Sequence, residues 1–215
     1  MKRDSIKRNH QTEYVGSIED AARYAREMKR FAWLFYRHDF KKVVELDAPG
    51  RYLEAASGPG ILAAMVAKAR PSVRIVCLDV SQEMVGVGRD YIHEQGLSDR
   101  IEFVVGDVSD EATVRSLGEF NLVYSTYSMH HWQAIEPALS NLWQAVKPGG
   151  TLYLADFRRV WWVGLIPFGG GLIESIKISL TPEELDHLAR MAHMTSYTVE
   201  TRFPWFVSLT AFRSQ

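Results

Sequence analysis

The sequence contains a single cysteine, Cys77, among its 215 residues. One thiol cannot form a disulfide within the chain and offers no thiolate cluster for a metal ion. Because Cys77 lies inside an apolar run, we expect it to be a small buried core residue. The histidines show no ligand spacing apart from the adjacent pair His130 and His131, whose side chains would diverge, so no metal site is predicted.

The chain also lacks an excess of charge of either sign. Its formal net charge is −1, which gives no electrostatic footprint for nucleic acid. The polar and basic residues 1–12 are interpreted as a solvated tail rather than a nucleic-acid-binding arm. No apolar segment follows them, so a secretory signal is not predicted.

No apolar run is long enough to predict a membrane span. The longest, Val160 to Ile173, is interrupted by Pro167 and four glycines, so stable membrane insertion is not expected. A cytoplasmic location is the resulting expectation. Internal repeats, low-complexity segments and interdomain linkers are also missing, and the length suits one domain spanning residues 1–215.

What the sequence does contain is a strand, a glycine turn and a helix within residues 51–68. Apolar residues 52–55 predict the strand, small residues 56–60 the turn, and residues 61–68 the helix. Glycines let a ligand approach the backbone closely, and the helix N-terminus offers free N–H groups. A second apolar run ends in Asp79, where an acid is placed to accept hydrogen bonds from ribose hydroxyls.

Two classes of cofactor fit this turn. Residues 58–63 satisfy the dinucleotide pattern G-x-G-x-x-G/A, which favours NAD. Glu54 argues against it, because a carboxylate at the junction of strand and turn would repel a pyrophosphate. The same carboxylate would attract the ammonium and sulfonium groups of S-adenosylmethionine.

Five segments in order resemble the motifs of the class I S-adenosylmethionine-dependent methyltransferases that act on small molecules. They are residues 54–60, 77–84, 103–108, 120–131 and 146–154. Ala56 departs from the family's usual first glycine and Asn121 from a common aspartate. The resemblance covers residues 51–157 and implies an α/β fold. This fold is Rossmann-like, with a mainly parallel seven-stranded sheet, helices on both faces and an antiparallel C-terminal strand.

The resemblance also implies a site for S-adenosylmethionine, with S-adenosylhomocysteine as the product. Gly58 and Gly60 would line the methionine part, Asp79 would hold the ribose diol, and Asp107 with Val108 would meet the adenine edge. The complete predicted cofactor-binding set is Tyr24, Glu54, Ala56, Ser57, Gly58, Gly60, Asp79, Val80, Met84, Gly106, Asp107, Val108 and Ser125.

Methyl transfer from a sulfonium mainly requires that the acceptor be positioned and desolvated. A base is needed only if the nucleophile arrives protonated. His130 and His131 follow the fourth predicted strand, and either is a candidate general base. The alternative is that one histidine bonds the backbone while the other is solvated.

The flanking segments are predicted to cover the site. Helical spacing predicts one helix after Ser17 and a second, aromatic-rich helix reaching Leu46, followed by a turn at residues 47–50. Residues 1–48 would thus form a helical cap from which, by resemblance, Tyr14 or Tyr24 reaches the cofactor, or merely packs. Residues 158–180 are interpreted as a substrate lid, with a dimer interface or a core insertion as alternatives. Residues 181–215 predict a helix and a hairpin.

The sequence therefore predicts a methyltransferase that moves a methyl group to a small acceptor, which an apolar lid suggests is hydrophobic. Two alternatives stay open. One is an NAD-dependent oxidoreductase, and the other is a relative that keeps the cofactor without transferring a methyl group. Whether the protein forms a homodimer is also left open.

Overall fold

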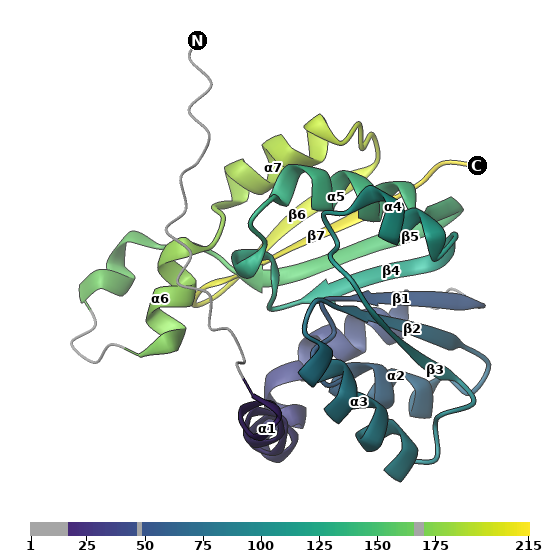
Figure 1. Cartoon of the computed structure of the whole chain (residues 1–215). Coiled ribbons are helices and arrows are strands. Elements are labelled where there is room, and N and C mark those ends of the chain that lie inside the picture. Colours follow the sequence, from purple (N-terminus) through teal and green to yellow (C-terminus); the bar gives the residue numbers. More distant parts are fainter. Residues whose placement is uncertain (1–16, 47–48, 166–169) are drawn as a thin grey trace.

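The computed structural model describes residues 17–46, 49–165 and 170–215. Its strands form one sheet in the order β3-β2-β1-β4-β5-β7-β6 (Figure 1). Only β7 runs against its neighbours, and every other neighbouring pair is parallel. The predicted fold class is therefore confirmed. The strands are β1 Arg51–Ala55, β2 Arg74–Asp79, β3 Ile101–Val105, β4 Phe120–Thr126, β5 Val146–Phe157, β6 Tyr197–Arg202 and β7 Phe206–Phe212.

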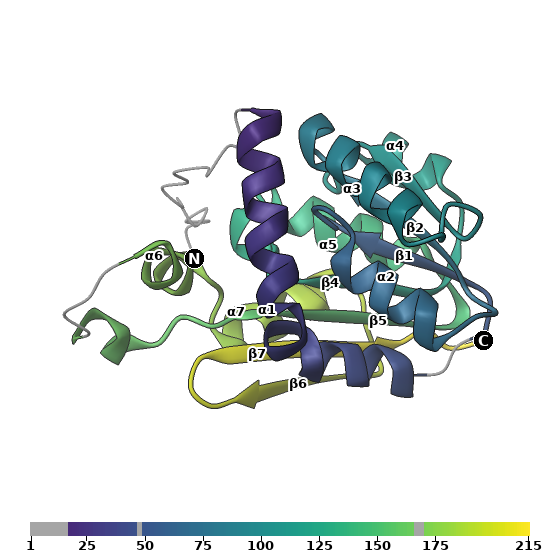
Figure 2. The same cartoon turned by 90° about the horizontal axis from the view of Figure 1, so that it is seen from below.

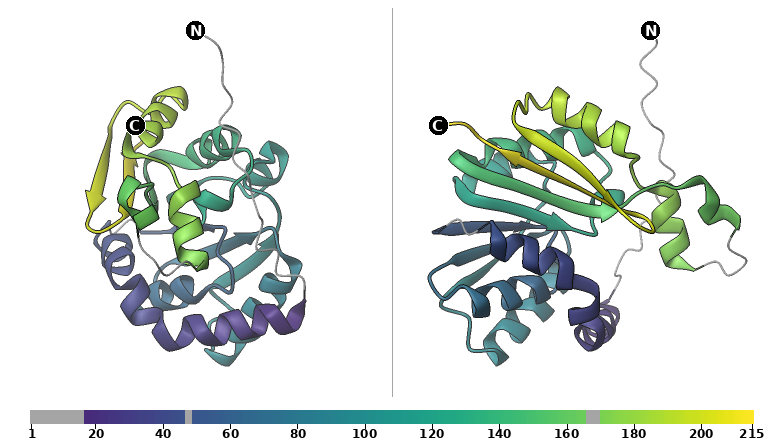
Figure 3. Two further views of the ribbon diagram at one scale, coloured as in Figure 1. Left: turned by 90° about the vertical axis from the view of Figure 1, so that its left-hand side faces the viewer. Right: turned by 180° about the vertical axis from the view of Figure 1, so that it is seen from behind.

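Helices cover both faces of this sheet. On one face lie α1 Ile18–Glu45, α2 Ile61–Ala69 and α3 Gln82–Glu94, and on the other α4 Glu111–Ser116, α5 Ile135–Gln144 and α7 Pro182–Met191 (Figures 1 and 3). Each face buries its own apolar cluster, which includes Leu62 and Ile75 on the first side and Leu139 and Leu152 on the second. The sheet thus forms the middle of three layers, as crossovers between parallel strands require.

The N-terminal segment is one helix, so the prediction of two separate helices was wrong. Ser17 is the N-cap, as expected, and its Oγ accepts a hydrogen bond from the backbone N–H of Asp20 at 3.1 Å. Neither proline nor glycine occurs within α1, so nothing in the sequence ends the helix before Glu45. The helix instead changes direction along its length and wraps around one end of α2 and α3 (Figure 2).

Two short elements follow β5 and project beside the ends of the strands (Figure 3). They are the 3-10 helix η2 at Trp161–Leu165 and α6 at Gly171–Ile178. They cover a third apolar cluster that includes Val163 and Ile176. The segment predicted as a lid therefore contains helical structure, although residues 166–169 lie outside the described residues. Tyr14 and part of the predicted turn, residues 47 and 48, also lie outside them.

The boundaries of several elements differ from the prediction by a few residues. The helix expected at residues 133–146 is α5 at Ile135–Gln144, because residues 129–131 first form the short 3-10 helix η1. The strand expected from Thr151 begins earlier, at Val146. Neither difference moves the carboxyl ends of β1, β2, β3, β4 and β5, which lie along one edge of the sheet.

Candidate functional site

The turn between β1 and α2 has the backbone conformation that glycine favours. Gly60 has φ 67°, and a Cβ added there would lie 2.6 Å from Cζ of Phe103, so no larger residue fits. Ala56 has φ 51°, also in the left-handed region. This position therefore carries strain that the family's usual glycine would avoid.

Asp79 links three of the strand ends. Its carboxylate accepts hydrogen bonds from the backbone N–H of Gly58 at 2.6 Å and from that of Ser81 at 2.9 Å. Its own carbonyl accepts one from the N–H of Gly106 at 2.9 Å. Burial raises the pKa of Asp79, and the hydrogen bonds from Ser81 and Gly58 act against that rise. The acid thus holds the glycine turn in place, in addition to any contact with a ligand.

Glu54 is buried at the end of β1. Its Oε2 accepts a hydrogen bond from the hydroxyl of Tyr124 at 3.2 Å and lies 4.0 Å from Sγ of Cys77. Burial raises the pKa of Glu54 to about 8, and the hydrogen bond from Tyr124 partly offsets this rise. A buried acid with few partners is costly as an anion, and a cationic ligand would compensate that cost.

A cavity of about 230 Å³, which we call the central cavity, lies at the carboxyl ends of β1 and β4 under α1 and α6. It brings together seven of the predicted site residues, which are Tyr24, Glu54, Ala56, Ser57, Gly58, His130 and His131. The rest of its wall is mostly apolar or aromatic and comprises Met28, Phe35, Tyr36, Pro59, Thr126, Tyr127, Phe157, Gly171, Leu172 and Ser175.

The two predicted histidines differ sharply in their surroundings. His130 is buried, and its Nδ1 lies 2.8 Å from Oδ1 of Asp156. Asp156, also buried, accepts hydrogen bonds from the backbone N–H of His130 at 2.8 Å and of Phe157 at 2.7 Å. His131 is exposed, and its ring lies 3.9 Å from that of His130. His130 is therefore held by a carboxylate that is itself fixed.

The remaining predicted cofactor residues do not line the central cavity. Val80 is 69% exposed beside the end of β2, while Ser125 is fully buried. The Ser125 hydroxyl donates to the carbonyl of Ala55 at 2.6 Å, joining β4 to β1. The other residues outside the cavity are Gly60, Asp79, Met84, Gly106, Asp107 and Val108. Their predicted contacts with the ribose and adenine stay predictions.

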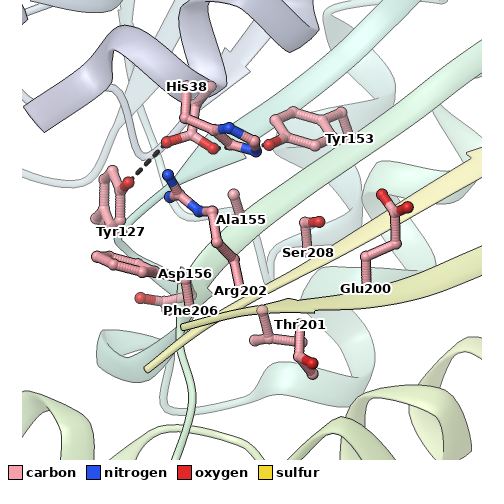
Figure 4. Close-up of a pocket in the computed structure, with 12 residues that line it drawn as sticks. His38, Tyr127, Tyr153, Ala155, Asp156, Glu200, Thr201, Arg202, Phe206 and Ser208 are labelled. Atoms are coloured by element: carbon pink, nitrogen blue, oxygen red, sulfur yellow. Dashed lines mark hydrogen bonds between the residues drawn. The ribbon is translucent and has the colours of Figure 1, made fainter. Parts of the chain in front are cut away.

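A second cavity of about 240 Å³, the rear cavity, lies between α1 and strands β5, β6 and β7 (Figure 4). Asp39 of α1 accepts hydrogen bonds there from the hydroxyls of Tyr127 and Tyr153, each at 2.7 Å. The Arg202 side chain extends from β6 toward Tyr127 and stacks on the ring of Phe206, 4.5 Å away (Figure 4). Tyr127 contributes to the walls of both cavities.

Sequence reasoning missed Asp156, Asp39 and the wall residue Tyr36, whereas Tyr127 was expected in the pocket wall and lies there. A signal was available for the two acids. Asp156 interrupts the apolar strand of residues 152–157, and Asp39 stands among aromatic residues of α1. A charged residue at a position that should be buried indicates a specific partner. Tyr36 gave no comparable signal.

Asn121, one of the two departures from the family pattern, has a structural role. Its Oδ1 accepts a hydrogen bond from the backbone N–H of Arg51 at 3.0 Å and so braces β4 against β1.

Cys77 is buried, as predicted. Within the described ranges, His, Cys, Asp and Glu side chains form no group of three that could hold a metal ion. None of the helices described is both long and apolar enough to cross a membrane.

Comparison with known proteins identifies the class to which this fold and site belong. Residues 53–150 match a family model described as a methyltransferase domain. A demethylmenaquinone methyltransferase of Thermus thermophilus is 29% identical over 137 residues, which cover 59% of this chain and 60% of that protein. A ubiquinone/menaquinone biosynthesis C-methyltransferase of Pseudomonas fluorescens is 31% identical over 110 residues, 51% of this chain and 42% of that protein. The chain thus matches at most 60% of the length of these two relatives.

Solved structures share the fold at low sequence identity. Human N-acetylserotonin methyltransferase, in a complex with SAM, superposes with a TM-score of 0.69 at 16% identity, covering 94% of this chain and 58% of that chain. The predicted resemblance is confirmed: residues 53–150 match a methyltransferase domain, and the chain shares its fold with a methyltransferase solved in complex with SAM. This match favours a methyltransferase over an NAD-dependent oxidoreductase as the interpretation of the glycine turn.

Proposed function

We propose that this chain binds S-adenosylmethionine at the carboxyl ends of β1 and β2 and transfers its methyl group to a small, hydrophobic acceptor in the central cavity. The observation that carries the proposal is the pairing of a buried, weakly compensated Glu54 with the glycine turn that Asp79 holds. When bound, the cofactor supplies an electrophilic methyl group on a sulfonium.

The residues present fit such a cofactor. Gly58 has φ 53°, and nothing lies within 4 Å of the place where its Cβ would be, so its backbone is open to a ligand. Glu54 lines the same cavity and offers a carboxylate for an ammonium group. Hydrogen bonds from Gly58 and Ser81 already fix the carboxylate of Asp79, so a ribose would bind to an acceptor whose position is set.

The acceptor is proposed to be small and to carry an apolar part, because aromatic rings line the cavity beside its polar groups. Phe35, Tyr36 and Phe157 face the cavity, together with Leu172 of α6. Charged side chains among the described lining residues are limited to Glu54 and, when protonated, the two histidines. The relatives are named as a demethylmenaquinone methyltransferase and a C-methyltransferase of ubiquinone/menaquinone biosynthesis, which is compatible with a hydrophobic acceptor. The segment 158–180 is proposed as its cover, since α6 supplies Gly171, Leu172 and Ser175 to the wall.

Calorimetric titration with S-adenosylhomocysteine tests the proposal, with NADH as the parallel ligand. We expect binding of S-adenosylhomocysteine that Asp79→Ala weakens at least tenfold, because the substitution releases the turn and removes the acid. Asp99→Ala, at a loop remote from the cavity, is the matched control. Binding of NADH alone, or of neither ligand, would contradict the proposal.

A relative that binds the cofactor without transferring a methyl group is the remaining alternative. Ala56 motivates it, since its Cβ stands in the wall of the central cavity. Binding of S-adenosylhomocysteine without turnover on a broad panel of acceptors would favour this alternative over a methyltransferase.

A further inference from the structure

The floor of the rear cavity is formed by small side chains that stand in one row across three strands. Ala155 of β5 lies opposite Ser208 of β7, which lies opposite Glu200 of β6. The next row along holds the larger Phe206 and Arg202. Residues directly opposite one another in antiparallel strands point to the same face of a sheet, and small ones leave space between larger neighbours. The cavity of about 240 Å³ lies over this row.

Charges of opposite sign face the cavity from β6. Glu200 and Arg202 are two residues apart on the same face of the strand, which places their Cα atoms about 6.6 Å apart. Arg202 extends toward Tyr127, whereas Glu200 stands apart from it (Figure 4). Within the described residues, the guanidinium of Arg202 forms no ion pair with a carboxylate. The cavity thus offers a cation and an anion that are not paired with each other.

Both charged groups can still bind a ligand. The carboxylate of Glu200 has Nζ of Lys42 at 3.9 Å, the outer limit of an ion pair, and its side chain is 63% exposed. The guanidinium of Arg202 stacks on the ring of Phe206, so its N–H groups point outward in their own plane. Burial raises the pKa of Tyr127, and the nearby Arg202 acts against that rise.

The other ionisable groups on the wall are engaged elsewhere or exposed. Each carboxylate oxygen of Asp39 accepts a hydrogen bond from a tyrosine hydroxyl. Asp156 is turned toward His130, whose ring and backbone N–H it binds. His38 is exposed on α1 and can add a hydrogen-bond donor. Glu200 and Arg202 are therefore the groups left to bind a charged ligand.

We propose that the rear cavity binds a small zwitterion, with its carboxylate on Arg202 and its ammonium group on Glu200. A guanidinium matches a carboxylate with two parallel hydrogen bonds, whereas an ammonium group binds a carboxylate as a point charge. The chain between the two groups would lie over Ala155 and Ser208. Because the protein's charges are at least two residues apart along β6, the ligand class is that of short ω-amino acids. The site does not depend on the proposed methyl transfer.

A series of amino acids of increasing length tests the ligand class by titration calorimetry. We expect γ-aminobutyrate to bind with a Kd of about 1 mM, an ordinary value for a molecule of its size. Butyrate and butylamine, which each carry one of its charges, should bind at least about fivefold more weakly. Glycine should also bind more weakly than β-alanine and γ-aminobutyrate, because its charges are too close together to reach both residues.

Two outcomes of this series would contradict the proposal. If butyrate or butylamine binds as tightly as γ-aminobutyrate, the ligand is not recognised as a zwitterion. If none of these compounds binds at concentrations up to about 10 mM, ten times the expected Kd, the rear cavity is not a site for this class.

Substitutions of the two charged residues test how the ligand is placed. Arg202→Gln should weaken γ-aminobutyrate binding at least about tenfold, because a guanidinium with two hydrogen bonds is lost. Glu200→Gln should weaken it by about fivefold, since this contact is partly exposed to solvent. Arg74→Gln on β2 and Glu102→Gln on β3, both remote from the cavity, are the matched controls and should leave the Kd unchanged.

The Glu200→Gln variant also separates the ammonium contact from damage to the cavity. Its binding of butyrate should equal that of the unmodified protein, because butyrate has no ammonium group. A loss of butyrate binding as large as that of γ-aminobutyrate would contradict the placement. Because Glu200 is exposed, this test holds even if Arg202→Gln destabilises the fold.

Binding in the rear cavity should also strengthen binding at the cofactor site. Both cavities are lined by residues of α1 and by Tyr127. A ligand between α1 and β6 would hold α1 against the sheet, and α1 supplies Met28 and Phe35 to the central cavity. We expect saturating γ-aminobutyrate to tighten S-adenosylhomocysteine binding about two- to fivefold, and the reverse effect to be equal. Unchanged affinities would overturn this coupling.

Failure of the rear site is distinguishable from failure of the proposed methyltransferase function. Binding of γ-aminobutyrate without binding of S-adenosylhomocysteine would defeat the methyltransferase and support the rear site. Binding of S-adenosylhomocysteine without binding of any member of the amino acid series would defeat the rear site alone.

Discussion

Glu54 makes binding of a cationic ligand depend on pH. Without a ligand its pKa is raised to about 8, so the side chain is mostly protonated at neutral pH. An ammonium group beside it would favour the anion and lower that pKa. Between about pH 5 and 8 a proton must then leave as the ligand binds.

We therefore expect S-adenosylhomocysteine to release up to one proton per molecule at pH 7, and its affinity to rise by as much as about tenfold per pH unit up to pH 8. Titration calorimetry in buffers of different ionisation enthalpy measures this release. Glu54→Gln should bind weakly and release none, whereas Glu102→Gln, on the exposed side of β3, should behave as the unmodified protein. Proton uptake on binding would contradict the proposed role of Glu54.

Glu54 also determines the direction in which the stability of the ligand-free protein changes with pH. Because the pKa of Glu54 is higher in the folded state than in the unfolded chain, the folded state holds the extra proton between about pH 4.5 and 8. This contribution to the free energy of unfolding is lost as pH rises through that window. In the Glu54→Gln variant the free energy of unfolding should decrease less between pH 6 and pH 8, as measured by urea unfolding at the two pH values.

Ala56 and Gly58 form a natural pair for testing backbone strain, since their φ values are 51° and 53°. Ala56→Gly should remove the strain of a left-handed alanine and leave the free energy of unfolding unchanged or higher by up to about 1 kcal/mol. It should also tighten S-adenosylhomocysteine binding by removing a Cβ from the cavity wall. Gly58→Ala should destabilise by about 1 kcal/mol. Chemical unfolding and calorimetry together measure both effects, and a less stable Ala56→Gly would refute the strain.

At the residue scale, the sequence predicts the members of the central cavity that come from the motifs. Glu54, Gly58 and His130 can be found because each lies at or shortly after the carboxyl end of a strand at a recognisable spacing. Asp156 was missed because its partner His130 is 26 residues away in the chain and becomes adjacent only when β4 and η1 pack beside β5. Contacts of the predicted cofactor residues with the cofactor itself stay predictions, as do the domain limits.

At the scale of elements, Asp39 links α1 to the sheet through hydrogen bonds. Asp39 is 1% exposed and accepts a hydrogen bond on each carboxylate oxygen, from Tyr127 and Tyr153. Asp39→Ala should lower the free energy of unfolding by about 3 kcal/mol, because two buried hydroxyls lose a charged partner. Urea unfolding measures the change.

A double-mutant cycle that combines Asp39→Ala with Tyr153→Phe isolates the hydrogen bond between these two residues. We expect a coupling energy of about 1–2 kcal/mol between Asp39 and Tyr153, and none between Asp39 and a remote tyrosine such as Tyr197. Tyr197 is a fair comparison, since its hydroxyl also donates to an aspartate, Asp186, at 2.9 Å. Additive effects of Asp39→Ala and Tyr153→Phe would show that α1 is held by apolar packing alone.

The elements of the core are easier to predict than those around it. Strands β1 to β4 are short apolar runs that end in turn residues, and Ser81 and Thr181 are recognisable as N-caps from the residues that follow them. The interior of α1 contains no such capping or turn residues. Its second half resembles a separate helix because its composition changes from alanine-rich to aromatic, although composition alone does not break the backbone hydrogen bonds of a helix.

At the scale of the whole molecule, ligand binding should increase the stability of the folded protein. S-adenosylhomocysteine at one hundred times its Kd should raise the free energy of unfolding by about 2.7 kcal/mol, which corresponds to a rise in Tm of roughly 5–10 °C for a chain of this size. Asp79→Ala should reduce the gain in free energy of unfolding to about 1.4 kcal/mol or less at the same ligand concentration, because binding is at least tenfold weaker. Asp39→Ala should start from a lower Tm and keep most of the rise. No shift with saturating ligand would contradict the site.

The overall architecture is predictable because alternating strands and helices leave few ways to form a sheet. The position of the two cavities is not, since each lies between segments that are distant in sequence. The rear cavity needs α1 to lie beside β5 and β6, and neither charge nor periodicity indicates that contact. Cytoplasmic location and a homodimer stay predictions from the sequence.

Tyr127 has a left-handed backbone at φ 54° and contributes to the walls of both cavities. One side chain thus limits how deep a molecule can enter from the side of His130. Its hydroxyl also donates a hydrogen bond to Asp39, so the residue that shapes this wall is also one that holds α1 to the sheet. In descendants of this chain, a substitution at position 127 would therefore change the cavity wall and the attachment of α1 together, so the shape of the site and the stability of the fold cannot vary independently there.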